Sequence, residues 1–510
     1  METDQVESII VVGGGDAGLL NALALEKGLA KADITVIDNF EDPIPEVGKS
    51  TLLTLARFLH QSLDIDQRRM LSEVKLAWKT TVHLKDWCGR EFYSPLGAEI
   101  PRSEQTSPVL LDQNHEREFQ EFYYRYQQGN FDTIYGEVAE HPGKTALIVS
   151  KDDPTSMSKA LPDAAYQFDT RSFNRFLRKV CRERGVTLVN DRITDVQTED
   201  GGIASVASDE AEYTADLYVD ATGFKRLLMN ELDNEFREYD LPVDSAVVTQ
   251  TDIDLSDIVS ATVVTTGEAG WFWQIDTLEV RDLGYVYSSS HISDDDAKRE
   301  LIEHREEDIA DNEFSQYRFD SGVLEEPWLE NCVAAGNAVG FVEPLQSTAL
   351  TTAGIMAERL GRMLAKHGRV NHQGLRDLYN ESALATWDEV YNFISLYYVF
   401  NSGSTDFWRD ARQINPDGIP QHETYQESGF AAPTDRFRLT RTDADLNEYF
   451  LYHLILHELG VKSAFFESVD VDVDPTVVDA VETYTANLSD RVEQLLSYEE
   501  FYRRYPTNFD

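Results

Sequence analysis

The stretch VESIIVVGGGDAG, residues 6–18, decides the fold that we expect for this chain. Its apolar half has the length of a β-strand. The glycines that follow, Gly13, Gly15 and Gly18, have the spacing G-x-G-x-x-G and precede an apolar run of helical type. The first glycine permits a tight turn, the second lets the backbone approach a pyrophosphate, and the third lets helix and strand pack closely. Amide groups at the helix start favour a phosphate. The stretch therefore predicts a Rossmann-like nucleotide-binding module.

Later positions extend this module. Asp38 ends the next predicted strand, about 20 residues after the glycines, where a carboxylate accepts a hydrogen bond from a ribose hydroxyl. Two further strand ends are ADLYVDATG at 215–223 and NCVAAGNA at 331–338. They supply four more candidate cofactor contacts: Asp220, Gly223, Gly336 and Asn337. An alternative is a pair of buried parallel strands with ordinary turns. Because the three elements occur in the order typical of flavin monooxygenases, we predict that the nucleotide is FAD.

Four further stretches resemble motifs of one family, the flavin-dependent tryptophan halogenases, and the resemblance spans nearly the whole chain. They are Trp78-Lys79 with Trp87, WFWQI at 271–275, FVEPLQST at 341–348 and TDFWR at 405–409. The corresponding family motifs are a Phe-Lys pair with a downstream tryptophan, W-x-W-x-I-P, F-x-E-P-L-E-S-T and T-P-F-W-R. Since W-x-W-x-I-P separates halogenases from related hydroxylases, the resemblance implies a flavin-dependent halogenase.

The resemblance also implies a reaction and a role for each motif. Reduced FAD, O2 and chloride or bromide would give hypohalous acid, which would pass through an internal tunnel to Lys79 beside an aromatic ring. A lysine in this role must be partly desolvated, so that its amine is reactive or its hydrogen bond is well aimed. The other implied site residues are Gln346 beside the lysine, Thr348 and Ala349 at the halide, Trp271 and Trp273 along the tunnel, and Ser94, Phe407 and Trp408 at the substrate. The stretch VGKST at 47–51 places Lys49, Ser50 and Thr51 beside the flavin.

The local patterns also allow structural roles for these residues. Residues 74, 76, 78, 82 and 84 are apolar, which predicts one strand with Lys79 on the same face as Lys75, His83 and Lys85. Such a face can be a solvated strand edge guarded by lysines. The tryptophans of WFWQI, spaced by two, can likewise form one buried strand face.

Several positions depart from the family pattern and bear on the substrate. Gln346 replaces a glutamate, and glutamine lacks the charge that would stabilise a cationic ring. Lys49 replaces an acid, Ala349 replaces a glycine, Ser94 stands where histidine is frequent, and Asp276 replaces the proline of the tryptophan motif. An electron-rich phenol, pyrrole or indole would need less help from the missing carboxylate. We therefore expect a small aromatic substrate of this class rather than tryptophan itself.

Two other functions stay open on the sequence alone. A flavin-dependent hydroxylase or reductase of the same superfamily would share the FAD motifs. A catalytically silent FAD-binding relative would tolerate the changes at Lys49, Asp276 and Gln346. The sequence has no second dinucleotide fingerprint, so we expect a separate flavin reductase to supply FADH2. The oligomeric state is open, with a homodimer as one alternative.

The composition predicts a protein adapted to concentrated salt. The 510 residues include 92 acidic and 45 basic side chains, a formal net charge of −47, and 42% hydrophobic residues, enough to form a core. Salt at about 1 M screens charges beyond about 3 Å, so a halophilic cytoplasm is expected. The charge repels nucleic acid, and no apolar run has transmembrane length. Three cysteines without a C-x-x-C pattern argue against zinc and disulfides. We therefore expect a cytoplasmic enzyme that binds no nucleic acid, membrane or metal.

The FAD motifs lie far apart in the chain, so we predict two interleaved modules in an α/β fold, α+β overall. The Rossmann-like FAD module would comprise residues 1–70, 145–235 and 325–365. The substrate module, with a β-sheet and a helical C-terminal region, would comprise residues 71–144, 236–324 and 366–510. Within it, the stretch 95–145 contains four prolines and is expected to be a loop-rich lid.

Overall fold

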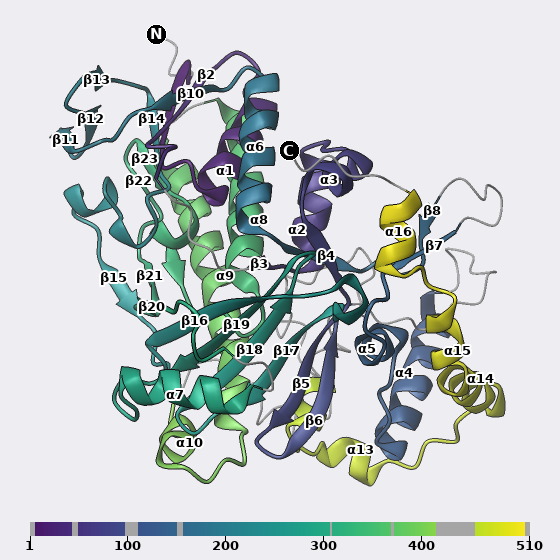
Figure 1. Ribbon diagram of the computed structural model, residues 1–510. Helices are drawn as coiled ribbons and strands as arrows, with labels where there is room; N and C mark the ends of the chain where they lie inside the picture. Colours follow the sequence, from purple (N-terminus) through teal and green to yellow (C-terminus); the bar gives the residue numbers. More distant parts are fainter. Residues whose placement is uncertain are drawn as a thin grey trace.

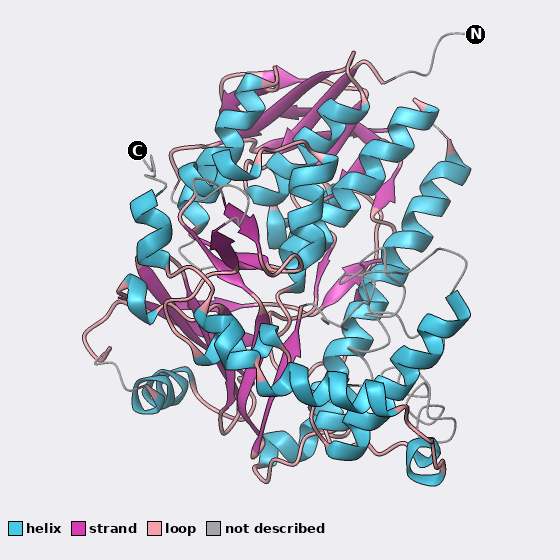
Figure 2. Cartoon of the chain, turned by 90° about the vertical axis from the view of Figure 1, so that its right-hand side faces the viewer, coloured by secondary structure: helices cyan, strands magenta, loops and turns pink. Residues whose placement is uncertain are grey.

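Two large β-sheets and their flanking helices make up the protein in the computed structural model (Figure 1). The structure describes residues 6–42, 49–96, 111–149, 157–305, 309–368, 372–414 and 454–504. In Figure 1 the sheet with β2 and β14 lies at the top and the sheet with β18 lies below it. Figure 2 shows the same arrangement from the side, with helices packed beside the upper sheet. The expected α/β fold, α+β overall, is confirmed.

A six-stranded sheet, parallel except at one edge, forms the nucleotide-binding region. In spatial order its strands are β10 (Thr187–Asn190), β2 (Asp33–Asp38), β1 (Ser8–Val12), β14 (Leu217–Asp220), β23 (Cys332–Ala334) and β22 (Trp328–Leu329). The edge strand β22 alone is antiparallel to its neighbour within this sheet. The central strands are apolar and buried, as expected for parallel strands covered on both faces. Segments far apart in the chain therefore build one sheet.

Helices α1 (Asp16–Gly28) and α6 (Thr170–Glu183) pack against this sheet, and α8 (Thr348–His367) packs against α1. Helices α1 and α8 approach so closely that a β-carbon on Gly28 would lie 2.5 Å from the Gly361 carbonyl oxygen. Asp169 is the N-cap residue of α6, and its carboxylate accepts a hydrogen bond from the Ser172 N–H at 2.7 Å. The close packing places the N-termini of α1 and α8 in one rigid unit.

A seven-stranded sheet forms the centre of the second region. In spatial order its strands are β20 (Ser315–Arg318), β16 (Ser245–Asp252), β19 (Val280–Tyr287), β18 (Gly270–Asp276), β17 (Ala261–Thr266), β5 (Thr81–Trp87) and β6 (Arg90–Pro95). Successive side chains of β18 face opposite sides of the sheet. Trp271 and Trp273 join the main core, whereas Phe272 packs under α7 (Asp294–His304), where its ring stacks on His304 at 4.0 Å.

The strand predicted around Lys79 is two strands in two different sheets. Strand β4 (Leu76–Lys79) pairs with β9 (Ala165–Phe168) in a small sheet that also contains β3 (Lys49–Ser50), whereas β5 belongs to the seven-stranded sheet. The strand is interrupted at Thr80, whose backbone N–H donates to the Ser260 carbonyl oxygen at 2.8 Å. The alternative of a solvated face shared with three other basic residues is wrong, because Lys79 has no exposed surface.

Part of the predicted lid is helical. Helix α4 (Leu111–Gln128), helix α5 (Ile134–Glu137) and the 3-10 turn η2 (Val138–Glu140) occupy the stretch that was expected to be loop-rich. Residues 97–110 of that stretch lie outside the described residues. The four prolines stand at positions 95, 101, 108 and 142, so residues 109–141 contain none. Because proline disrupts helix interiors, this proline-free segment was the overlooked signal for a helix.

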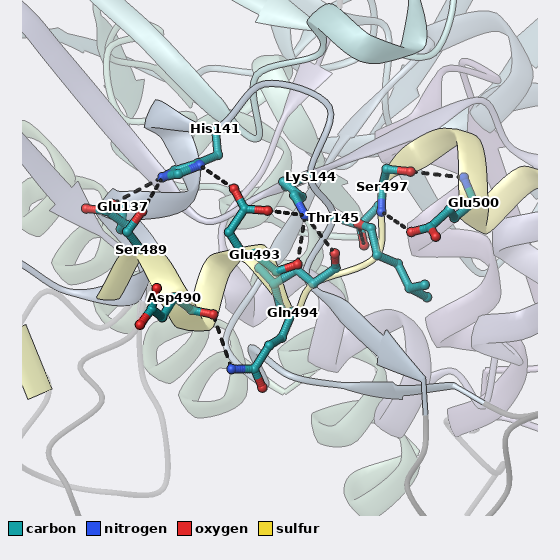
Figure 3. A network of polar contacts seen from close by, with 12 residues as sticks. Glu137, His141, Lys144, Thr145, Ser489, Asp490, Glu493, Gln494, Ser497 and Glu500 are labelled. Atoms are coloured by element: carbon teal, nitrogen blue, oxygen red, sulfur yellow. Dashed lines mark hydrogen bonds and ion pairs between the residues drawn. The ribbon is translucent and has the colours of Figure 1, made fainter. Parts of the chain in front are cut away.

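Of the C-terminal helices, α14 (Pro475–Ala486) contacts α4 and α15 (Leu488–Glu493) contacts α5, whereas α16 (Tyr498–Arg504) lies farther up in Figure 1 and contacts the 3-10 turn η5 (Leu255–Asp257). A polar network joins them to the segment after α5 (Figure 3). His141 lies between Glu137 and Glu493, and Lys144 Nζ donates to the Glu493 carbonyl oxygen at 3.0 Å. Since α5 contacts β5 and β6, this network braces the part of the sheet that follows Lys79.

The remaining elements are short, except for α9. The helices are α2 (Leu53–Arg57), the π-helical turn η1 (Phe58–Ser62), α3 (Gln67–Glu73), η3 (Gly223–Lys225), η4 (Met229–Glu231), η5 (Leu255–Asp257), η6 (Gly336–Ala338), α9 (Gln373–Val399), α10 (Asp406–Ala411) and α13 (Ala464–Ser468). The strands are β7 (Leu147–Val149), β8 (Met157–Lys159), β11 (Asp195–Glu199), β12 (Gly202–Ala207), β13 (Glu212–Tyr213), β15 (Phe236–Glu238), β21 (Gly322–Leu324) and β24 (Gly340–Phe341). Within the described ranges, no helix has the length and apolar character needed to span a membrane. The module boundaries stay predictions.

Candidate active site

The glycine turn lies between β1 and α1, where close contacts require glycine. Gly13 has a φ of 108°, and a β-carbon there would lie 2.3 Å from the Ala221 carbonyl oxygen. A β-carbon on Gly18 would lie 2.0 Å from the carbonyl oxygen of Gly13. Asp38 Oδ2 accepts a hydrogen bond from the Gly14 N–H at 2.8 Å, which joins the end of β2 to the turn. The structure therefore contains the strand, turn and helix that the first glycines predicted.

The surroundings of this turn fit a dinucleotide such as FAD. Among the described residues, apart from the adjoining backbone, no atom lies within 4 Å of the place where a β-carbon of Gly15 would stand, so a ligand can approach the backbone there. The N-terminus of α1 adds N–H groups and the positive end of the helix dipole. Gly336, with a φ of 60°, follows β23 so close to α1 that a β-carbon would lie 2.5 Å from the Ala17 side chain, and the partly exposed Asn337 comes next. These residues stay predicted FAD contacts.

Asp220 is buried, and its carboxylate accepts hydrogen bonds from residues that follow it closely in the chain. Oδ1 accepts hydrogen bonds from the N–H and hydroxyl of Thr222, and Oδ2 accepts from the N–H groups of Leu228 and Met229 at 2.8 and 2.9 Å. Gly223, with a φ of 67°, begins the intervening turn η3. Asp220 therefore anchors the segment 222–229, and direct contacts of Asp220 and Gly223 with FAD stay predictions.

The VGKST stretch is joined to the start of α1, beside the glycine turn, by an ion pair of its lysine. Lys49 Nζ forms an ion pair with Asp16 Oδ2 at 2.8 Å, and Asp16 is the first residue of α1. Ser50 and Thr51 are buried and bond within the protein: Ser50 Oγ lies 2.7 Å from Thr262 Oγ1, and Thr51 Oγ1 donates to the Tyr166 carbonyl oxygen at 2.8 Å. Only the lysine of the three is partly exposed beside the predicted flavin position.

Lys79 is a buried lysine without a carboxylate partner in the described part of the chain. Its Nζ donates a hydrogen bond to Ser347 Oγ at 3.0 Å, and the side chain has no exposed surface. Burial lowers its pKa to about 7, because a buried ammonium loses its hydration. Near neutral pH the amine is therefore a mixture of a charged donor and a neutral nucleophile.

Ser347 places the lysine beside the start of α8. It has a φ of 58° and a ψ of 38°, the left-handed region that non-glycine residues rarely adopt, and it is the N-cap residue of α8. Thr348 and Ala349 follow as the first helical residues, whose N–H groups lack intrahelical acceptors and favour an anion. The predicted lysine and halide positions are thus connected through one serine, which the sequence had not singled out.

Gln346 and Ser94 meet at a tyrosine that the sequence did not identify. Gln346 Nε2 donates to the hydroxyl of Tyr397 at 2.8 Å, and Ser94 hydrogen-bonds the same hydroxyl. All three side chains are buried. Tyr397 lies in α9, where a tyrosine in a helical pattern is indistinguishable from core. Two predicted site residues from distant parts of the chain therefore share one polar contact.

Trp271 and Trp273 lie side by side, with ring centroids 6.1 Å apart. Trp271 Nε1 donates toward Glu343 Oε2 at 3.1 Å and the Tyr398 hydroxyl at 2.9 Å. Burial raises the pKa of Glu343 to about 8, although hydrogen bonds from Leu345 N–H, Tyr398 and Trp271 favour its charged form. Glu343 is part of FVEPLQST, but sequence reasoning gave it no role. The signal available in the sequence was an acidic residue between apolar neighbours in this motif.

Phe407 and Trp408 belong to α10 and are buried in an aromatic cluster. The Trp408 ring stacks on Tyr398, with centroids 6.0 Å apart, and meets Trp87 edge-on at 5.4 Å. Trp408 Nε1 donates to the Gly267 carbonyl oxygen at 2.9 Å, which fixes the ring. Through Tyr398 this cluster connects to the tryptophans of β18. The aromatic residues predicted at the tunnel and the substrate therefore belong to one connected cluster of buried rings, called the aromatic wall below.

A cleft of about 420 Å³ opens on the outer side of this region. It is lined by Cys88, Thr266, Gly267, Glu268, Phe272, Glu300, Glu303, His304, Gly403, Ser404, Thr405 and Trp408. Trp408 borders this cleft, whereas Lys79 and Gln346 do not line it.

Sequence comparisons give one consistent result. The family model described as tryptophan halogenase matches residues 8–452. Tryptophan 6-halogenase SttH of Streptomyces toxytricini is 30% identical over 451 residues, which cover 82% of this chain and 84% of the relative. Tryptophan 7-halogenase RebH of Lentzea aerocolonigenes is 27% identical over 443 residues, which cover 84% of this chain and 83% of the relative.

Solved structures agree over both regions of the molecule. The crystal structure of SttH superposes with a TM-score of 0.82 at 25% identity and covers 98% of this chain and 100% of its own. BrvH, a flavin-dependent halogenase from Brevundimonas sp. BAL3, superposes with a TM-score of 0.78 at 25% identity and covers 99% of this chain and 100% of its own. The similarity thus includes the six-stranded sheet, the seven-stranded sheet and the helices around them.

Proposed function

This chain belongs to the tryptophan halogenase family of flavin-dependent enzymes, and on that premise we propose that it halogenates a small electron-rich aromatic ring at Lys79. The observation that supports this most is the buried amine of Lys79, hydrogen-bonded to Ser347 at the N-terminus of α8. The halide would be chloride or bromide. As in the rest of the family, reduced flavin would come from a separate reductase.

FAD would bind at the glycine turn. Gly13, Gly15 and Gly18 would face its pyrophosphate, Asp38 the adenosine ribose, and the end of β23 its other half. When bound in reduced form, the cofactor supplies the means to oxidise halide with O2 to hypohalous acid. The free N–H groups of Thr348 and Ala349 would hold the halide, because they present partial positive charge at the start of α8.

Lys79 would then transfer the halogen. Hypohalous acid that meets the neutral amine forms a nitrogen–halogen bond as its oxygen–halogen bond breaks, and the displaced hydroxide leaves with an amine proton as water. A ring carbon next attacks the halogen, the nitrogen–halogen bond breaks, and the ring proton restores the amine. The protonated lysine could instead hold hypohalous acid by a hydrogen bond. A pKa of about 7 makes both forms available.

The surroundings of Lys79 favour a ring that is already activated. Gln346 is neutral and held by Tyr397, so no carboxylate from position 346 can stabilise the cationic ring that forms in the transition state. Phenols, pyrroles and indoles carry their own donating heteroatom and need less stabilisation. Ser94 and Trp408 would border the ring on the substrate side.

The test uses purified protein in molar KCl or KBr with FAD, NADH and an unrelated flavin reductase. Mass spectrometry is used to search for halogenated products from a panel of phenols, pyrroles, indoles and weakly activated benzenes. We expect a halogen isotope pattern on the electron-rich members, and its loss in Lys79→Met with FAD still bound. An oxygenated product without halogen would favour a hydroxylase instead. Halogenation confined to weakly activated rings would overturn the proposed substrate class.

A further inference from the structure

One face of the β5–β6 hairpin carries a histidine next to two glutamates. His83 lies on β5, Glu91 lies on β6, and Glu140 ends the 3-10 turn η2. His83 Nε2 is 3.0 Å from Glu91 Oε1, and His83 Nδ1 is 3.9 Å from Glu140 Oε1. Among the described residues, these three form the one group of potential metal-ligating side chains whose ligand atoms, one from each residue, all lie within 4.8 Å of one another. Three separate elements therefore bring an imidazole and two carboxylates to one place.

The pairing of the two strands sets the positions of His83 and Glu91. His83 lies opposite Tyr93 in the hairpin, and the centroids of their rings are 4.5 Å apart. Glu91 comes two residues before Tyr93 and so shares its face of the sheet, because side chains alternate along a strand. The opposite face of the hairpin joins the core cluster that contains the aromatic wall, through side chains that include Val82 and Leu84. His83 and Glu91 are therefore on the face turned away from the aromatic wall.

The turn after α5 supplies the third side chain. Helix α5 packs on the hairpin (Figure 1), and Gly136 leaves room there for the Tyr93 ring, since a β-carbon on Gly136 would lie 2.9 Å from Tyr93 Cγ. The Tyr93 hydroxyl donates a hydrogen bond to Glu140 Oε1, the same oxygen that lies near His83. Hydrogen bonds from neighbouring side chains are the usual means by which a protein orients its metal ligands. Glu140 is therefore held with a carboxylate oxygen toward the histidine.

The charges of the group are those that a divalent cation would balance. Two carboxylates this close repel each other unless a cation or a proton lies between them. Among the described residues no lysine or arginine, Lys85 on the same strand included, forms an ion pair with Glu91 or Glu140. Histidine binds metals through its neutral imidazole. The three side chains thus leave two negative charges for one divalent ion.

A second histidine between two glutamates shows what a neighbouring lysine changes. His141 lies 3.2 Å from Glu137 Oε1 and 3.8 Å from Glu493 Oε1 (Figure 3), spacings close to those around His83. Lys144 Nζ, however, lies 3.6 Å from Glu493 Oε2 and supplies a positive charge there. The network at His141 is therefore balanced by the protein itself, whereas the group at His83 has no such lysine in the described part of the chain.

We propose that His83, Glu91 and Glu140 bind one divalent transition-metal ion, of which Zn²⁺ fits best, and that this ion joins the β5–β6 hairpin to η2. Zinc–ligand bonds of about 2.1 Å at tetrahedral angles place ligand atoms about 3.4 Å apart, so only small shifts of the side chains are needed. An imidazole ligand favours such an ion over Mg²⁺, which prefers oxygen ligands. Because the side chains of Glu91 and Glu140 are 59% and 52% exposed, water would complete the coordination.

This site is independent of the proposed halogenation, because its three ligands lie outside the Lys79 relay. It replaces our expectation that the chain binds no metal, which rested on the three cysteines. Chelator-treated, full-length protein is titrated with ZnCl2 in a calorimeter at one fixed KCl concentration, so that chloride competes equally for zinc in every variant. We expect about one Zn²⁺ per chain in the unmodified protein. Glu91→Gln and Glu140→Gln should each bind Zn²⁺ at least about tenfold more weakly, since a neutral amide is a poor ligand.

The matched control is Glu137→Gln, which removes the carboxylate beside His141, three residues before Glu140, and should bind zinc as the unmodified protein does. Tyr93→Phe keeps the ring but loses the hydrogen bond to Glu140, so we expect weaker binding, by up to about tenfold. Absence of a saturable zinc site would overturn the proposal. Zinc affinity that is the same in Glu91→Gln, Glu140→Gln and the control would also overturn it, because the ion would then bind elsewhere.

Thermal unfolding gives a second measure that also shows whether each variant is folded. Zinc should raise the melting temperature of the unmodified protein and of Glu137→Gln, because a ligand that binds the folded state stabilises it. The same zinc concentration should leave the melting temperature of Glu140→Gln nearly unchanged, although this variant still unfolds cooperatively. An equal rise in Glu140→Gln would contradict a site at η2. Zinc binding without any halogenated product would leave this site standing while the proposed function fails.

Discussion

Two lysines four residues apart show how differently the surface and the interior of this protein treat a charge. Lys75 is 28% exposed in its side chain and pairs with Glu279, one of the many acids of the surface. Lys79 is fully buried, and its hydrogen bond goes to a hydroxyl. The surface therefore satisfies a cation with an opposite charge and water, whereas the interior leaves Lys79 with a neutral partner. Burial, rather than residue type, therefore lowers the pKa of Lys79 to about 7.

The largest expected effect comes from removing each amine in turn. Lys79→Met should reduce halogenation by at least about 100-fold, the scale of losing a positioned reactive or donor group. Lys75→Met should keep kcat within about twofold, because an exposed ion pair contributes little. Halogenated product is measured by mass spectrometry, and the bound flavin by its absorbance. Equal losses in the two variants would show that the interior lysine has no special role.

The next effect tests the lack of charge at position 346, in the residue before Ser347. Gln346→Glu puts a carboxylate into the loop residue next to Ser347, where it can stabilise both an ammonium and a cationic ring. We expect about tenfold faster halogenation of weakly activated rings and a smaller change for phenols. Gln346→Met, which is also uncharged, serves as the control and should not speed up weak substrates. A gain in Gln346→Met as large as in Gln346→Glu would exclude charge as the cause.

Stability against pH distinguishes the two buried ionisable groups by the sign of their slopes. Lys79 has a pKa lowered from 10.5 to about 7 by burial, so the unfolded chain binds more protons between these values and stability rises with pH there. Glu343 has a pKa raised from 4.5 to about 8, so its contribution is complete below pH 4.5 and is lost as pH rises to about 8. Together the two groups favour a minimum of stability near pH 7 to 8.

The free energy of unfolding in urea, measured at constant KCl between pH 5 and 10, tests these two slopes. Each pKa unit corresponds to about 1.4 kcal/mol, so each slope should be visible within its window. Lys79→Met should remove the rise above pH 7, and Glu343→Gln should remove the fall below pH 8. The prediction fails if either variant keeps the slope assigned to the missing group.

The sequence predicted the parts of this site that depend on neighbours in the chain. The turn at Gly13, Gly15 and Gly18 follows from local spacing, and the period of WFWQI predicted which side chains of β18 share a face. The break at Thr80 and the left-handed conformation of Ser347 leave no such pattern, because contacts with distant segments produce them. For the same reason the tyrosines of α9 looked like helix core, although they join residues more than 50 positions away.

The smallest expected effect is that of salt, which should stabilise the protein through its exposed charges and leave the pKa of a buried group nearly unchanged. The net charge of −47 makes exposed acids repel one another, and the screening length falls from about 10 Å at 0.1 M salt to about 3 Å at 1 M. Melting temperature should therefore rise with KCl in the unmodified protein and in Lys79→Met alike. The pKa of Lys79, measured from the pH dependence of halogenation, should move by less than about 0.3 unit between 1 and 3 M KCl, because screening is weak for buried groups. A larger shift would mean that solvent ions reach this side chain, and the interior would then not be the dry region that its lowered pKa requires.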